Sequence, residues 1–105
     1  LGRMVLNGGA WEGRQVVPTD WIAASTAPSI ATGDGLHYGY FWWLGNTEAA
    51  DGAHAYVAGF GNGGQRLFIV PSLDLTVAIT AGNYNGPDGR LSNPLFHQFA
   101  AALLV

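Results

Sequence analysis

The spacing of hydrophobic positions changes along the chain from helical to strand-like and back to helical. Residues 1–6 carry apolar side chains three and four positions apart and end on an Asn-Gly-Gly sequence, which is typical of the last turns of a helix. A turn-rich link follows at residues 11–17. A second short helix is predicted over residues 18–26, because its opening proline is preorganised for a first helical turn.

The middle of the chain has the composition of strands and turns. Residues 27–36 contain proline and two glycines and are predicted to form a loop. Residues 38–44 are dense in aromatic side chains that suit a pleated sheet, and residues 46–53 form a polar connection. Three further strands are predicted after it, separated by turns at 62–64 and 71–74, and they span 55–61, 65–70 and 75–81.

The chain closes with a loop at 83–89 and a helix over 93–105. The apolar positions of this helix form a stripe that should lie on the sheet, made of Leu95, Phe96, Phe99, Ala102 and Leu103. Two helices, four antiparallel strands and a last helix predict an α+β fold with a sheet of about four strands. A length of 105 residues fits a single domain.

The composition changes this picture in one respect. Hydrophobic residues make up 49% and charged residues only 10%, whereas a soluble domain has roughly 25% charged residues. Some of the surface is therefore expected to be covered by more protein. A net charge of −3 argues against a nucleic-acid partner. No apolar run reaches the ~18 residues of a membrane span, and neither the histidine spacing nor the absence of cysteine suggests a metal or another cofactor.

The segment 59–66, Gly-Phe-Gly-Asn-Gly-Gly-Gln-Arg, is the densest candidate for chemistry. A glycine lacks a Cβ, so another group can approach the backbone closely there. A plain hairpin turn is one interpretation. The segment also fits the dinucleotide pattern G-x-G-x-x-G, but a strand rather than a helix follows it, which excludes that reading.

The same segment resembles the third active-site motif of serine β-lactamases, penicillin-binding proteins and related esterases, in which K-T-G or H-x-G begins a strand beside the active site. Residues 61–65 resemble the G-H-G-G-Q variant of that motif. Residues 38–43 resemble the family's Y-G-x-G-W-W strand, and residues 68–75 resemble its F-V-V-P-x-x-D-L hairpin. Residues 6–9 and 15–21 are similar to the preceding helix and link, so the resemblance covers nearly the whole chain.

The resemblance implies a role for each residue of the triplet. Asn62, Gly63 and Gly64 would occupy it, with Asn62 where the family has Lys or His. Asn62 can donate hydrogen bonds but cannot carry charge or take a proton. The backbone N–H of Gln65 would form half of an oxyanion hole. Asn62 and Gln65 are therefore the candidate catalytic residues, and Gly63 and Gly64 are candidate substrate contacts.

The loop after the last strand would lie at the mouth of that site. Asn83, Asn85 and Arg90 are its candidate substrate-binding residues, and Arg90 is the best suited because a guanidinium pairs bidentately with a carboxylate. Capping of the loop is the alternative role for these side chains.

The nucleophile that the family uses is missing. The chain has no lysine, so S-x-x-K cannot occur, and neither Y-x-N nor G-x-S-x-G is present. The four serines at 25, 29, 72 and 92 lie in cap, loop and turn contexts that favour structural roles. His54 is expected to be a solvated loop residue, and His97 to be structural.

The resemblance thus implies that residues 1–105 are the C-terminal fragment of an extracytoplasmic serine hydrolase that cleaves an amide or ester through an acyl-enzyme. Its partners would be the N-terminal remainder that carries the nucleophile and a small acyl substrate. The fragment alone should be inactive, and it could form a homo-oligomer through an exposed sheet surface.

Two functions of other classes remain open. A carbohydrate-binding module would use exposed aromatic rings as platforms, and a pure association domain would complete a larger protein. Aromatic side chains on both faces of residues 38–44 are more simply explained by burial than by sugar binding.

Overall fold

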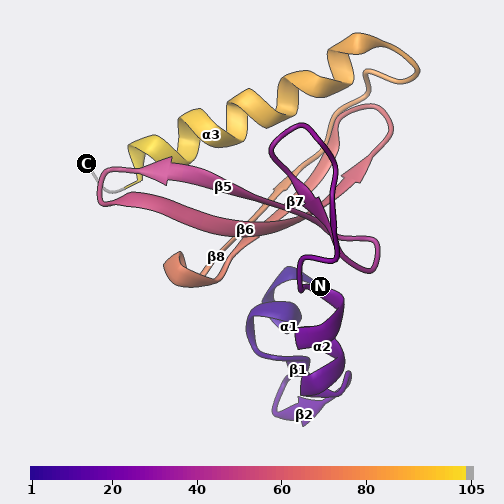
Figure 1. The fold of residues 1–105 in the computed structure, drawn as a ribbon, viewed down its shortest axis with the longest axis vertical. Coiled ribbons are helices and arrows are strands. Elements are labelled where there is room, and N and C mark those ends of the chain that lie inside the picture. Colours follow the sequence, from indigo (N-terminus) through magenta and orange to yellow (C-terminus); the bar gives the residue numbers. More distant parts are fainter. Residues whose placement is uncertain (104–105) are drawn as a thin grey trace.

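A computed structural model describes residues 1–103 and has the predicted α+β fold (Figure 1). No helix in this part of the chain has the length and apolar character needed to cross a membrane. The α-helices are α1 (Gly2–Leu6), α2 (Thr19–Ser25) and α3 (Ser92–Ala102), with 3-10 helices η1 (Pro71–Leu73) and η2 (Pro87–Leu91). The strands are β1 (Ala10–Trp11), β2 (Arg14–Gln15), β3 (Ile30–Ala31), β4 (His37–Tyr38), β5 (Trp43–Ala49), β6 (Gly52–Gly61), β7 (Gln65–Val70) and β8 (Leu75–Ile79).

The main sheet has six strands rather than about four. They lie in sequence order from β3 to β8, and each pair of neighbours is antiparallel. The additional strands β3 and β4 have two residues each, and β3 lies in the segment predicted as a loop. β1 and β2 form a separate small hairpin in the link between α1 and α2.

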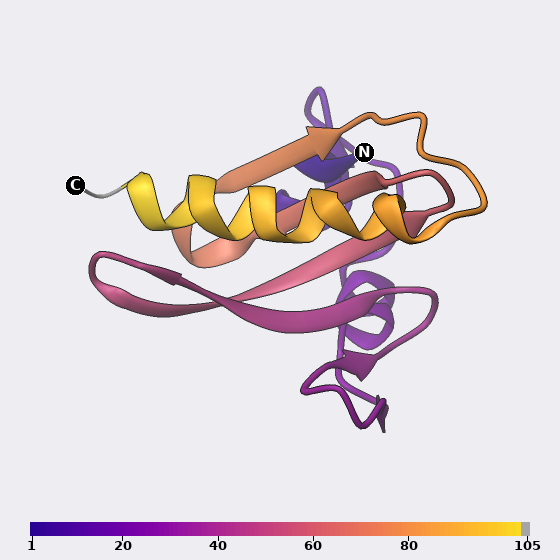
Figure 2. The same cartoon turned by 90° about the horizontal axis from the view of Figure 1, so that it is seen from above.

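Both faces of the sheet are covered, because successive side chains of a strand point to opposite faces. Ala58 and its cross-strand partner Phe68 face α3, whereas Val57 and its partner Ile69 face α1 and α2. Figures 1 and 2 show α3 lying along one side of the sheet and the two N-terminal helices on the other. The structure is therefore three layers thick.

The α3 layer is centred on stacked aromatic rings. Phe96 and Ala100 are fully buried, and the Phe96 ring stacks on Phe68 with 3.7 Å between centroids. The predicted apolar stripe is wrong in part, since Leu95 is 57%, Phe99 45% and Leu103 40% exposed, and Ala102 is exposed as well. A helix packed on a sheet buries only a narrow strip, here at four-residue spacing, and these side chains lie beside that strip.

The predicted strand 38–44 is wrong at its centre, although its two ends belong to β4 and β5. Its centre is a turn, in which the Gly39 N–H donates to the Trp42 carbonyl at 2.8 Å and Phe41 has a φ of +66°. The end of α2 causes this break: a Cβ on Gly39 would lie 2.6 Å from the Ser25 carbonyl oxygen, and the Tyr40 N–H donates to that oxygen. Contact with a helix thus overrides the strand propensity of the aromatic residues.

The predicted polar connection 46–53 is also wrong, since β5 continues to Ala49 and the turn occupies only the next two residues. Thr47 is buried and its hydroxyl contacts the Nδ1 of His97 in α3 at 2.9 Å. The structural role predicted for His97 agrees with this contact. Pairing with β6 satisfies the backbone of this polar segment, which explains why a strand forms without hydrophobic alternation.

Candidate functional site

The candidate site is built around the turn that joins β6 to β7. Gly61 pairs with Gln65 across the turn, and Asn62, Gly63 and Gly64 lie between them. Gly63 and Gly64 have φ values of +87° and +95°, which residues with a Cβ rarely adopt. The local backbone therefore depends on glycine at both positions.

The turn lies beside the loop that leads to α3, at one end of the sheet in both views (Figures 1 and 2). The Asn83 N–H donates to the Gly63 carbonyl at 2.9 Å. Ser92, at the start of α3, donates its hydroxyl to the Gly64 carbonyl at 2.8 Å. Two segments more than fifteen residues apart in sequence are thus fixed against each other.

Asn62 and Asn85 extend this contact with a pair of hydrogen bonds. The Asn62 Nδ2 donates to the Asn85 Oδ1 at 3.0 Å, and the Asn85 N–H donates to the Asn62 Oδ1 at 3.1 Å. An amide nitrogen carries two hydrogens, so one remains for a ligand. Asn83 donates from its side chain to the Asp88 carbonyl at 3.4 Å. Loop capping is therefore a real function of these asparagines.

Arg66 holds the site together and was not among the residues predicted from sequence. Its guanidinium donates to the carbonyls of Gly61, Gln65 and Gly89 at 2.8–3.0 Å, and its Nε donates to the Asn93 Oδ1 at 2.6 Å. The group also lies 4.6 Å above the Phe60 ring, and burial lowers the pKa of Arg66 below its ordinary value. In the sequence, the feature that indicates this structural role is the position of Arg66 between the glycine turn and the apolar residues of β7.

A small hollow of about 150 Å³ opens between the turn and the loop. It is lined by backbone and by two arginines, and its lining residues are Gly61, Asn62, Gly63, Gly64, Arg66, Gly86, Gly89 and Arg90. Arg90 is exposed, and within residues 1–103 its side chain makes no hydrogen bond or ion pair. A cation is therefore available at the rim of the hollow.

Gly64 is one of the glycines that line this hollow. The residue is buried, yet its N–H has no acceptor among the hydrogen bonds of the described part of the chain. A Cβ on Gly89 would lie 3.2 Å from the Gly64 nitrogen, so the glycine there keeps the space beside it open. A buried N–H without an acceptor is uncommon in proteins and indicates a position for a ligand or a water.

Gln65 does not point its side chain at the hollow. The side-chain amide donates to the Ala81 carbonyl, and the backbone opens β7. The Ser92 hydroxyl beside the turn is buried and donates to a carbonyl. The residues that line the hollow offer hydrogen-bond donors and two guanidinium groups, and none of these lining residues is an aspartate, glutamate or histidine.

The histidines lie away from this turn. His54 is near the start of β6 and not in a solvated loop, so that prediction is wrong. Gly61 lies seven positions further along β6, and a strand advances about 3.3 Å per residue, which places His54 roughly 23 Å from the turn. His37 is exposed in β4. In the described part of the chain no group of three potential ligands could hold a metal ion.

A scan against models of protein families finds no match, and a search of curated proteins finds none either. The resemblance to serine β-lactamases and penicillin-binding proteins therefore stays a prediction that depends on the quoted motifs.

Proposed function

We propose that this chain is the C-terminal, sheet-forming part of a serine acyl hydrolase, in which the β6–β7 turn forms one wall of the substrate site. The observation that carries the proposal is the N–H of the buried Gly64, which has no acceptor in the described residues and belongs to a residue that lines a hollow rimmed by Arg90. A backbone N–H of this kind stabilises the negative charge on an acyl oxygen, and an arginine binds a substrate carboxylate.

The arrangement supports a supplementary role rather than a complete enzyme. The hollow offers donors and positive charge, and among residues 1–103 neither an activated nucleophile nor a base lines it. A separate segment of polypeptide would supply the serine that attacks the acyl carbon. The structural basis of the wall is the set of hydrogen bonds that Arg66, Asn83 and Ser92 make to the turn.

An exposed apolar groove of about 690 Å³ supports the presence of that segment. It lies between the N-terminal helices and the 38–42 turn, and large exposed side chains surround it, among them Trp21, Ile30, Tyr40 and Phe41. Exposed apolar side chains gathered around a groove mark an interaction site for protein or ligand. The occupant we propose is the apolar face of the segment that carries the nucleophile, and the low charge of the chain is consistent with it.

The same groove argues against the carbohydrate-binding alternative. Trp21 and Tyr40 are 5.5 Å apart with rings inclined at 45°, so they do not form a flat platform. Sugar sites also need several polar partners, whereas this groove is predominantly apolar. An association domain without chemistry remains the second candidate, favoured by the same exposed aromatic side chains.

The test uses the intact parent protein and a chromogenic ester and β-lactam. Asn62→Ala should lower kcat about three- to tenfold, since one neutral hydrogen bond contributes roughly 0.5–1.5 kcal/mol. Gly64→Val should reduce turnover further by blocking the hollow. Arg90→Gln should raise KM for substrates with a carboxylate and leave neutral esters unaffected. Arg14→Gln, an exposed arginine of β2, is the matched control.

Thermal melts of each variant separate loss of function from loss of folding. If folded Asn62→Ala and Gly64→Val proteins both keep full activity, the β6–β7 turn is not a wall of the active site. Full activity of every variant on all substrates would favour the association domain instead.

A further inference from the structure

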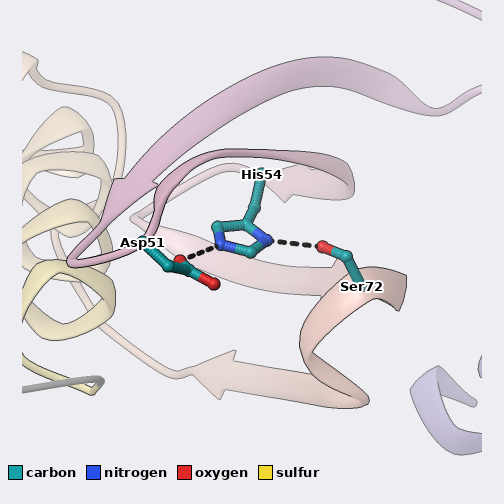
Figure 3. Close-up of polar contacts among 3 residues, drawn as sticks. All are labelled: Asp51, His54 and Ser72. Carbon is teal, nitrogen blue, oxygen red and sulfur yellow. Dashed lines mark hydrogen bonds and ion pairs between the residues drawn. The ribbon is translucent and has the colours of Figure 1, made fainter.

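A second polar constellation lies at the other end of the sheet, far from the glycine turn. The Nδ1 of His54 lies 2.7 Å from the Ser72 Oγ, and the Nε2 of His54 lies 2.6 Å from the Asp51 Oδ1 (Figure 3). Asp51 is in the β5–β6 turn, His54 is in β6, and Ser72 is in η1. Three segments of the chain thus bring a hydroxyl, an imidazole and a carboxylate into one row.

The chemistry of the partners decides where the proton on His54 lies. An ionised carboxylate accepts hydrogen bonds only, so the Nε2 of a neutral His54 must carry the hydrogen and donate it to Asp51. The Nδ1 then has a lone pair and accepts the hydroxyl hydrogen of Ser72. A hydroxyl bound to a base that a carboxylate orients is the arrangement that activates a serine nucleophile.

The exposure of the three side chains suits this role. Ser72 is exposed and accessible to a reagent, whereas the His54 side chain is only 11% exposed. Asp74, the residue after η1, forms an ion pair of 2.7 Å with Arg3 in α1, and this contact links the turn to the helix. The hydroxyl is therefore held on a short, anchored turn rather than on a mobile loop.

We propose that Ser72 is a nucleophile activated by His54 and Asp51, and that it accepts an acyl group from an activated carboxylic ester. The Ser72 Oγ forms a bond to the ester carbonyl carbon, and the bond from that carbon to the leaving oxygen breaks. The hydroxyl proton passes to the Nδ1 of His54, and Asp51 stabilises the resulting imidazolium. The alkoxide or phenolate departs, and the product is an acyl-Ser72 ester.

This inference is independent of the proposed function. It concerns a stoichiometric acylation of the chain itself and not turnover at the glycine turn. The two proposals fail separately, because variants at positions 62, 64 and 90 test only the turn. The sequence alone predicts only a structural role for Ser72 in a turn. The structure shows that the imidazole of His54 lies beside its hydroxyl.

The experiment treats the 105-residue chain with p-nitrophenyl acetate and locates the acetyl group by peptide mass spectrometry. The chain has neither lysine nor cysteine, so the N-terminal amine is the main competing nucleophile. Ser29 is an internal reference, because it is exposed and its hydroxyl makes no hydrogen bond in the described residues. Ser72 should react at least about 100-fold faster than Ser29, the lower range of general-base assistance.

Two variants distinguish activation from a merely structural contact. Asp51→Asn should slow acetylation of Ser72 at least tenfold with the fold intact, since an amide that donates to Nε2 leaves the hydrogen on Nδ1. Ser72→Ala should remove the fast phase, and Ser29→Ala should leave it unchanged. The proposal is overturned if Ser72 and Ser29 react at similar rates, or if folded Asp51→Asn protein reacts as fast as the original chain.

Discussion

Replacement of Gly64 by alanine should destabilise the protein considerably more than the same replacement at Gly35. Both glycines have a left-handed backbone, with φ values of +95° and +86°. A residue with a Cβ pays about 1–2 kcal/mol in that conformation, so this contribution is common to both variants. The two positions differ in the space around them.

A Cβ on Gly35 would meet nothing within 4 Å. On Gly64 it would lie 3.0 Å from the Ser92 Oγ, 3.1 Å from the Ala81 Cβ and 3.2 Å from the Gly89 carbonyl oxygen. Overpacking of a filled site costs about 1–3 kcal/mol, so Gly64→Ala should lower the free energy of unfolding by about 2–5 kcal/mol in total. Gly35→Ala should lower it by only about 1–2 kcal/mol.

Urea denaturation followed by tryptophan fluorescence measures both values, since the chain contains four tryptophans. A thermal melt gives a second measure, with roughly 4–8 °C of Tm per kcal/mol for a domain of this size. Equal losses for the two variants would refute the reasoning that the loop before α3 packs tightly against the turn. That packing also positions the Gly64 N–H, so the experiment tests the basis of the proposed site.

Three further experiments probe the packing and the polar contacts. Phe96→Ala should lower the free energy of unfolding by about 3–5 kcal/mol, because the stacked ring is fully buried, and Phe99→Ala should lower it by roughly 1 kcal/mol. Similar losses for the two variants in urea denaturation would contradict the burial pattern of α3. Arg66→Lys should lower Tm, because a lysine cannot reproduce the four directed hydrogen bonds, and Arg14→Lys should not. Burial lowers the pKa of His97 below its ordinary value of 6.5, so the unfolded chain takes up the proton first and stability falls as the pH drops below about 6.5. The fall in Tm between pH 7.5 and pH 5.5 should be smaller in His97→Gln, and an equal fall would show that other groups cause it.

The amino-acid sequence by itself was sufficient for the elements whose signals are local. Three of these signals reflect short-range preferences of the backbone. They are the proline at the start of α2, the hydrophobic pattern of β6, β7 and β8, and the Asn-Pro sequence at the start of α3. The glycine turn at 62–64 belongs to the same class, because the positive φ values of Gly63 and Gly64 favour glycine over residues with a Cβ. The α+β class follows from the order of these elements.

Only the tertiary structure decided the features that depend on contacts between distant segments. The aromatic segment 38–44 breaks because the carbonyl of Ser25 lies against Gly39, and no local pattern records that contact. The strand β5 extends through polar residues because β6 satisfies its backbone. Which side chains of α3 are buried depends on how the helix meets the flat sheet.

The candidate site divides in the same way. The residues around the turn could be selected from sequence, because glycines, asparagines and an arginine are concentrated in the two loops that form it. The role of Arg66 depends on carbonyl groups from three separate segments that only folding brings together. The row of Asp51, His54 and Ser72 spans the ends of two hairpins, and its chemistry exists only because antiparallel pairing places those ends side by side.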